Sequence, residues 1–146
     1  AHVEQGRVLE TLARPDEAIA AYFRAAEFTP NQPEIMLRIG AIQLQKGQSE
    51  QALVRLDQAI EIAPENAEAR LLRGQANLAT RRVSEAIADL RFAVEKLPQR
   101  PDAHYHLALA LEADNKRGDA LMSAEKVLRL APDFAGARDL SSRLRR

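Results

Sequence analysis

The sequence predicts an all-α protein, an α-solenoid built from stacked helical hairpins, and three observations lead to this prediction. First, a proline recurs at a fixed step of 34 residues without an insertion, at Pro30, Pro64, Pro98 and Pro132. Second, small residues recur at fixed phases of the same period. Third, 46% of the residues are hydrophobic but only 4% are aromatic, so the core must consist of Ala, Leu, Ile and Val, as in closely packed helices.

The recurring proline defines a repeat in which we number it place 32. The repeats are then 1–32, which lacks its first two residues, 33–66, 67–100 and 101–134, with 135–146 left over. Place 8 holds Gly6, Gly40, Gly74 and Ala108; place 20 holds Ala18, Ala52, Ala86 and Ala120; place 27 holds Ala25, Ala59, Ala93 and Val127. Small residues at these places indicate two helices that approach each other closely.

Each repeat contains the signals of two helices joined by a turn. In the second half, places 21 and 28 carry mostly large apolar residues at helical spacing. Between the halves, turn residues precede acidic residues that suit a helix N-terminus, and Pro15 suits a first-turn position. The proline at place 32 cannot continue a helix, so it predicts a tight corner before the next repeat.

These residues on this period resemble the tetratricopeptide repeat family, whose 34-residue unit is a helix–turn–helix with small residues and a closing proline at set places. The resemblance covers essentially the whole chain and implies a right-handed superhelix whose concave face is lined by the first helix of each repeat. Stacked neighbours would form the continuous core, and 135–146 would be a capping helix or the start of a truncated fifth repeat.

The chain departs from the family pattern at several bulky places. The large aromatic of place 4 is replaced by His2, Met36, Arg70 and His104. Gln43 and Asn77 stand at place 11, and Arg73 replaces the usual leucine of place 7. We therefore expect looser packing in the third repeat, with Gln43 and Asn77 hydrogen-bonding across adjacent repeats.

Composition argues against several classes of function. Twenty-one basic residues balance twenty-one acidic ones, which removes the long-range field of a nucleic-acid or anionic-membrane binder. The chain has no cysteine, hence no disulfide or thiolate metal site, and no apolar run approaches the roughly 18 residues of a membrane span. The sequence leaves the compartment open.

No motif indicates catalysis, a cofactor or a metal site, and we expect none of the three. The phosphate-binding glycine patterns and the His-Glu-x-x-His pattern are missing. His104 and His106 point about 200° apart on a helix and cannot share a metal ion. His106 lies near the predicted groove, where it could tune binding with pH.

A candidate peptide-binding face follows from the helical wheel of the first helices. Places 2, 5, 9, 12 and 13 lie opposite the packed side and should be polar if nothing covers them. Instead, they carry an apolar stripe in the middle repeats that Tyr105 and Leu109 extend, with an acidic row along one edge. The candidate peptide-binding residues are Leu37, Ala41, Leu44, Leu71, Gln75, Leu78, Tyr105 and Leu109, with Glu34, Glu68, Asp102 and Arg38 at the margin.

Three interpretations of the stripe remain open. It can be a groove floor that accepts apolar anchors of a partner peptide or helix. It can be packing between neighbouring first helices, brought together by superhelical curvature. It can also be a surface covered by further repeats or by a second copy of the chain, which would make a homo-oligomer.

One known binding mode of the family is disfavoured. The variant that clamps the C-terminal carboxylate of a chaperone peptide needs Lys and Asn at places 5 and 9, Asn at place 6 of the next repeat, and Lys and Arg at places 2 and 6 of a third. In one register this chain has Val3, Arg7, Arg38, Glu68 and Leu72 there; in the next it has Leu37, Ala41, Leu72, Asp102 and His106.

The sequence therefore predicts a non-enzymatic protein-interaction scaffold that binds a partner peptide or helix in a concave groove. Two alternatives remain. Because the chain begins at Ala1 without an initiator methionine, it can be the regulatory or targeting segment of a larger enzyme. It can also be a self-association module.

Overall fold

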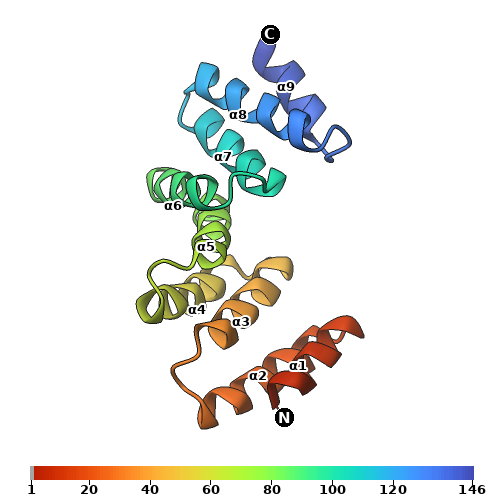
Figure 1. Ribbon diagram of the computed structural model, residues 1–146, viewed down its shortest axis with the longest axis vertical. Coiled ribbons are helices and arrows are strands. Elements are labelled where there is room, and N and C mark those ends of the chain that lie inside the picture. Colours follow the sequence, from red (N-terminus) through yellow and green to blue (C-terminus); the bar gives the residue numbers. More distant parts are fainter. Residues whose placement is uncertain (1) are drawn as a thin grey trace. The chain divides into compact units, whose positions relative to one another are not determined.

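The computed structural model describes residues 2–146, and all regular secondary structure in that range is α-helical (Figure 1). The helices are α1 (His2–Thr11), α2 (Pro15–Phe28), α3 (Pro33–Gln45), α4 (Ser49–Ile62), α5 (Ala67–Ala79), α6 (Val83–Lys96), α7 (Pro101–Ala113), α8 (Arg117–Leu130) and α9 (Ala137–Arg145). The prediction of an all-α fold made of helical hairpins is confirmed.

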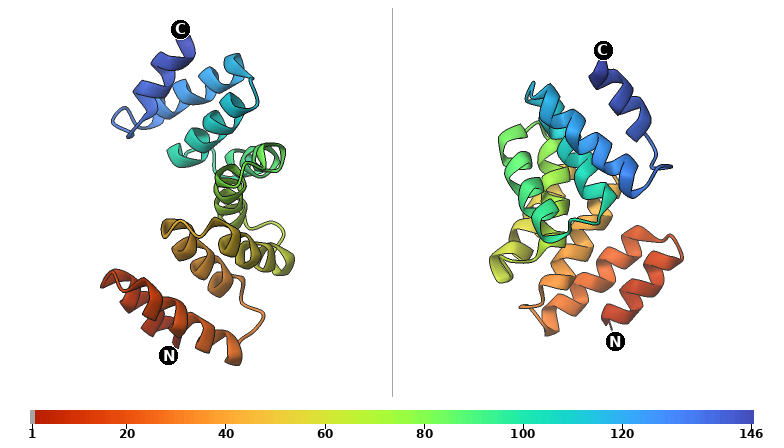
Figure 2. Two further views of the ribbon diagram at one scale, coloured as in Figure 1. Left: turned by 180° about the vertical axis from the view of Figure 1, so that it is seen from behind. Right: turned by 45° about the horizontal axis from the view of Figure 1, so that its top comes forward.

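The chain divides into two compact units, Ala1–Leu72 and Arg73–Arg146, and the division falls within α5. In the N-terminal unit, α1 packs on α2, α2 on α3, and α3 on α4, as the views of Figures 1 and 2 show. In the C-terminal unit, α6 packs on α7, α7 on α8, and α8 on α9. Within each unit, helices that follow one another in sequence are therefore neighbours in space.

The turn between the two helices of every repeat has the same backbone conformation. Place 15 has positive φ in all four repeats, at Ala13 (56°), Gly47 (77°), Arg81 (65°) and Asn115 (62°). The following residue donates its N–H to the carbonyl five residues earlier, for example Gln48 to Gln43 at 2.8 Å and Arg82 to Asn77 at 2.7 Å. This is the Schellman arrangement that satisfies the last carbonyls of a helix.

The recurring proline marks a second turn, between repeats. Each second helix ends two residues before it, at Phe28, Ile62, Lys96 and Leu130. After the last three of these ends, a backbone hydrogen bond closes the turn around the proline, as from Asn66 N to the Ala63 carbonyl at 3.1 Å. Proline suits this position because its fixed φ matches the turn and its missing N–H cannot extend the helix.

The glycines at place 8 let the two helices of a hairpin approach closely. A Cβ atom on Gly40 would lie 2.8 Å from Cγ of Leu56, and one on Gly74 would lie 2.6 Å from Cγ of Leu90. Both leucines stand at place 24 and are fully buried. The fourth repeat has alanine at both places, Ala108 and Ala124, so a larger residue at one place is balanced by a smaller one at the other.

The hydrogen bonding of Asn77 in the third repeat differs from the expected bond across adjacent repeats. Its hairpin contains a buried polar network in which Arg73 and Asn77 of α5 both donate to Asp89 of α6. Asn77 therefore bonds within its own hairpin and not across repeats, because Asp89 offers it a carboxylate. At the corresponding place of the second repeat stands Arg55, and the buried Oε1 of Gln43 has no hydrogen-bond partner among the described residues.

The last helix, α9, turns its apolar side toward α8. Leu140 and Leu144 are buried, whereas the arginines of α9 are exposed. The helix begins after Gly136, which has a φ of 83°.

Candidate protein-binding surface

Two of the predicted groove residues are not available to a partner. Leu71 is fully buried and Leu37 is only 5% exposed, contrary to the expectation that both face a groove. Leu37 belongs to a core cluster with Ile35 and Met36 that also includes Ala69 of α5. A wheel drawn for one helix places position 5 inside the outer sector, and it cannot show that a neighbouring helix covers that position.

The remaining predicted residues of the N-terminal unit lie on a partly open face of α3. Ala41 and Leu44 are half-buried, as are Glu34 and Arg38. Arg38 donates from Nε to Oε1 of Glu34 at 3.0 Å, one turn earlier on the helix. The acidic margin at Glu34 is therefore paired with a predicted basic residue.

Next to this face, the first helices α1 and α3 enclose a hollow of about 380 Å³, which we call the α1–α3 hollow. Its lining residues are Arg7, Glu10, Thr11 and Arg38. Only Arg38 was among the predicted site residues. The other three stand at places 9, 12 and 13, which the wheel assigns to the same face, but they are polar and so fell outside an apolar stripe.

The charges around the hollow are organised by hydrogen bonds. Tyr22 of α2 donates its hydroxyl to Glu10, and burial, followed by this bond and the charge of Glu10, raises the pKa of Tyr22. Arg7 donates to Glu4 at 3.1 Å. Burial by itself lowers the pKa of Arg38, but its hydrogen bond and ion pair with Glu34 outweigh burial and raise it. The guanidinium group of Arg38 therefore stays charged beside the hollow.

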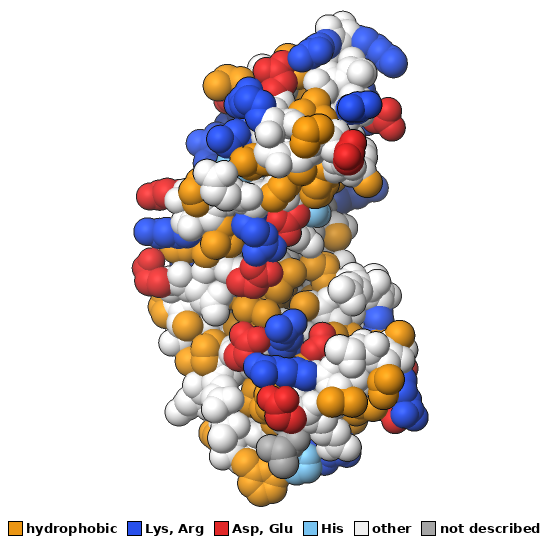
Figure 3. Space-filling view, turned by 45° about the vertical axis from the view of Figure 1, so that its right-hand side comes forward, with side chains coloured by type: hydrophobic (Ala, Val, Ile, Leu, Met, Phe, Trp, Pro, Cys, Tyr) orange, Lys and Arg blue, Asp and Glu red, His pale blue; other side chains and the backbone are white. Residues whose placement is uncertain are grey.

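The charged side chains of the two signs are intermixed on the face drawn in Figure 3. In the lower part of that view, which shows the N-terminal unit, blue and red side chains lie directly beside one another. The charges on this face therefore form local pairs and not a field of one sign.

In the C-terminal unit, Gln75, Leu78 and Leu109 are half-buried. Tyr105 is also half-buried, and its ring packs against Phe134 with a centroid distance of 5.0 Å. A Cβ atom on Gly136 would lie 2.7 Å from the Tyr105 hydroxyl. The segment that leads into α9 therefore covers part of the Tyr105 ring, which was predicted to face the groove.

The acidic row also takes part in local structure. Asp102 accepts two hydrogen bonds from Arg100, at 3.0 and 2.7 Å. Burial by itself raises the pKa of Asp102, but the bonds and charge of Arg100 hold it below its usual range. Glu68 is half-buried on α5.

His104 and His106 of the fourth repeat contact different backbone carbonyls. His104 Nε2 lies 2.9 Å from the Pro98 carbonyl, and His106 Nδ1 lies 2.8 Å from the Asp102 carbonyl.

Within residues 2–146, no group of three or more His, Cys, Asp or Glu side chains is arranged to hold a metal ion. None of the helices in the described range combines the length and apolarity needed to cross a bilayer.

Comparison with protein families identifies the repeat. The family model described as tetratricopeptide repeat matches residues 37–101 and 79–133, which together are more than half of the chain. The chain belongs to the tetratricopeptide repeat (TPR) family. No curated protein sequence gives a match.

Solved TPR structures share this fold. MamA (residues 41 to the end) from Desulfovibrio magneticus RS-1 superimposes with a TM-score of 0.90 at 20% identity, over 98% of this chain and 81% of that one. The thermophilic TPR protein TTC0263 from Thermus thermophilus gives 0.78 at 22% identity, over 98% and 79%. The first TPR domain of Spaghetti (RPAP3), solved with the HSP90 peptide SRMEEVD, gives 0.73 at 19% identity, over 77% and 90%.

Proposed function

We propose that this TPR chain is a non-enzymatic protein-interaction module that binds a peptide or helix of a partner protein on the first-helix face. The observation that carries the proposal is the α1–α3 hollow, which Arg7 and Arg38 line. Ala41 and Leu44, at places 9 and 12 of α3, are partly exposed on the same predicted face. Such a site offers charge for orientation and apolar surface for affinity.

The chemistry of the hollow favours a partner segment with an acidic group beside an apolar side chain. A guanidinium group has five N–H donors, and each of the two arginines uses one of them in a hydrogen bond to a described residue. Donors therefore remain for a carboxylate of the partner, which arginine binds well. Leu44 and Ala41 supply the neighbouring apolar contact.

The comparison with a peptide-bound TPR domain supports the same class of function. The RPAP3 domain binds its HSP90 peptide with the fold found here. The acids and bases at the hollow are tied to one another: Glu4 bonds Arg7, Glu34 bonds Arg38, and Glu10 accepts from Tyr22. These three hydrogen bonds fix the positions of the charged groups that a partner would contact.

A displayed library of random peptides tests the proposal. We expect the wild-type chain to enrich sequences with Asp or Glu next to an aliphatic or aromatic residue. Leu44→Glu and Arg38→Glu should abolish the enrichment while leaving helical content and melting nearly unchanged, since both positions are partly exposed. Leu71 is unsuitable for this purpose, because a charge at a fully buried position would unfold the protein.

Val54→Glu is the matched control. Val54 is 53% exposed on α4, a second helix, so its replacement adds the same charge as Leu44→Glu away from the first-helix face. Enrichment that survives in Leu44→Glu and Arg38→Glu, or that disappears equally in Val54→Glu, would refute the assignment.

A further inference from the structure

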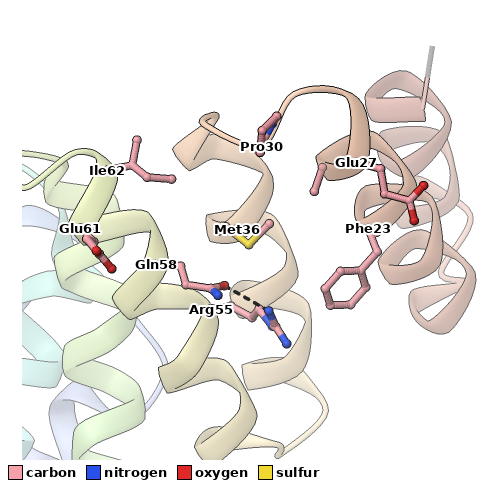
Figure 4. A pocket seen from close by; sticks show the side chains of 9 residues that line it. Phe23, Glu27, Pro30, Met36, Arg55, Gln58, Glu61 and Ile62 are labelled. Atoms are coloured by element: carbon pink, nitrogen blue, oxygen red, sulfur yellow. Dashed lines mark hydrogen bonds between the residues drawn. The ribbon is translucent and has the colours of Figure 1, made fainter.

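A separate cleft lies on the second helices of the N-terminal unit. It has a volume of about 550 Å³ and runs between α2 and α4 over the first turn of α3; we call it the α2–α4 cleft (Figure 4). Met36, only 8% exposed, forms the floor, with Phe23 and Ala26 from α2 on one side and Ile62 from α4 on the other. Figure 4 shows Met36 between Phe23 and Ile62. The cleft is therefore apolar at its base.

The residue at place 4 explains why the cleft is open and apolar. In the third repeat this place holds Arg70, which donates to the Pro64 carbonyl at 3.3 and 3.2 Å. In the fourth it holds His104, whose Nε2 lies 2.9 Å from the Pro98 carbonyl. Met36 has no donor for Pro30. Its slender, flexible side chain leaves space where the family pattern has a tryptophan.

The walls of the cleft carry two carboxylates that lack a cation. Glu27 stands on the α2 side and Glu61 on the α4 side, as Figure 4 shows. Both are exposed, and neither forms an ion pair with a residue in the range 2–146. Arg55, the cation among the lining residues, pairs with neither carboxylate: its guanidinium lies 4.9 Å from the ring centroid of Phe23, and Nη1 donates to Gln58 at 3.1 Å. Its Nε is buried and has no hydrogen-bond partner among the described residues.

We propose that the α2–α4 cleft binds a helical segment of a partner protein that inserts one large apolar side chain and carries Lys or Arg on the neighbouring turns. The apolar floor accepts the side chain, and Glu27 and Glu61 pair with the cations. A helix fits because the walls are helices with satisfied backbone groups, so they offer no strand edge to an extended chain. This site goes beyond the proposed function, which uses the opposite helices of the same repeats.

The chain contains a built-in probe for the experiment, because its two methionines are Met36 in the cleft and Met122, which is 68% exposed on α8. The chain is labelled with methyl-¹³C methionine and titrated with an alanine-rich helical peptide. The peptide carries one phenylalanine, a lysine four residues before it and an arginine four residues after it. We expect the ring to shift the Met36 methyl signal and to leave Met122 unchanged.

Variants then assign the binding to the cleft. Met36→Trp fills the floor with the residue of the family pattern and should weaken peptide binding, measured by fluorescence anisotropy, more than tenfold. Ile62→Lys places a cation on the wall at a 39% exposed position and should also weaken peptide binding more than tenfold. This variant tests the cleft independently of whether Met36→Trp folds. Glu27→Gln with Glu61→Gln should weaken binding about fivefold at low salt. Glu95→Gln, at the matching place of α6, should have no effect.

Several outcomes would overturn the proposal. They are the absence of any Met36 shift, a shift of Met122 in its place, and unchanged affinity in Met36→Trp and Ile62→Lys. Equal binding of a peptide with glutamates in place of the two cations would refute the role of Glu27 and Glu61. A Met36 signal that moves with protein concentration alone, together with a dimer mass in sedimentation, would show that a second copy occupies the cleft.

Discussion

Arg73 of α5 and Asp89 of α6 form a two-point ion pair inside the hairpin of the third repeat. Nε and Nη2 of Arg73 each lie 2.8 Å from a different carboxylate oxygen of Asp89. Asn77 Nδ2 donates to the same carboxylate at 3.1 Å. The side chain of Asp89 is only 3% exposed. A position that the family pattern fills with leucine is thus occupied by a charge that has its own buried partner.

Removing one member of this network should be costly. Asp89→Ala leaves the guanidinium of Arg73 and the amide of Asn77 without their acceptor, so we expect a loss of about 3–5 kcal/mol in the free energy of unfolding. Urea unfolding followed by circular dichroism measures it. A loss below about 1 kcal/mol would show that the pair does not hold α5 to α6.

Replacing the whole network should be tolerated. The fourth repeat holds Leu107 and Leu111 at the places of Arg73 and Asn77. The triple variant Arg73→Leu, Asn77→Leu, Asp89→Ala has no buried charge left without a partner, and we expect its stability to lie within about 1 kcal/mol of wild type or above it. A triple variant as unstable as Asp89→Ala would contradict this expectation.

The close approach at Gly40 predicts a coupled pair of substitutions. Gly40→Ala forces a Cβ to within 2.8 Å of Leu56 and should cost about 1–3 kcal/mol. Leu56→Ala alone should cost about 2–5 kcal/mol. The double variant reproduces the alanine pair of the fourth repeat, so we expect it to be less destabilised than the sum by about 1 kcal/mol. Strict additivity in a double-mutant cycle would argue against the contact.

The turn at place 15 predicts a stabilising substitution. Arg81 has a φ of 65°, a conformation that costs a residue with a Cβ atom more than it costs glycine. Arg81→Gly should therefore raise the free energy of unfolding by about 0.5–1 kcal/mol. Gly47→Ala, at the same place of the second repeat, is the reciprocal control and should lower it. Thermal melting of both variants checks the two signs.

The contact between α7 and α9 should depend on pH. Arg143 donates two hydrogen bonds to Glu112, at 2.7 and 2.8 Å, and these bonds outweigh partial burial and lower the pKa of Glu112. A carboxyl group with a depressed pKa contributes stability above its unfolded value of about 4.3, and this contribution is lost as the pH falls through the folded value. The wild type should thus lose more stability than Glu112→Gln between about pH 5 and pH 3. Equal slopes for both chains would exclude the effect.

Much of the fold could be predicted because its signals are local and repeated. Pro64 marks the end of α4 wherever the chain lies in space, since a missing N–H and a fixed φ act within one turn. Gly40 signals a close helix contact because it recurs in register with Gly6 and Gly74. The positive φ at place 15 could be predicted in only two of the four repeats. Gly47 and Asn115 are residues that often adopt positive φ, whereas Ala13 and Arg81 rarely do.

The candidate site was less predictable, because exposure depends on neighbours that a helical wheel does not contain. Leu44 and Leu71 look alike in sequence, yet the first is half-buried and the second has no exposed surface. Arg7 and Glu10 are polar and so do not belong to the predicted apolar stripe, although they line the hollow with Arg38.

The order of residues was enough to establish the repeat, its helical hairpins and the places of its turns, because periodic small residues and prolines act through the backbone and nearest contacts. The packing of the helices was needed to learn which apolar residues remain accessible. It enclosed Leu37 and Leu71, turned Asn77 toward Asp89, and left a cleft over Met36 where other repeats bond a proline carbonyl. Burial and pairing are properties of several helices together, and no single stretch of residues encodes them.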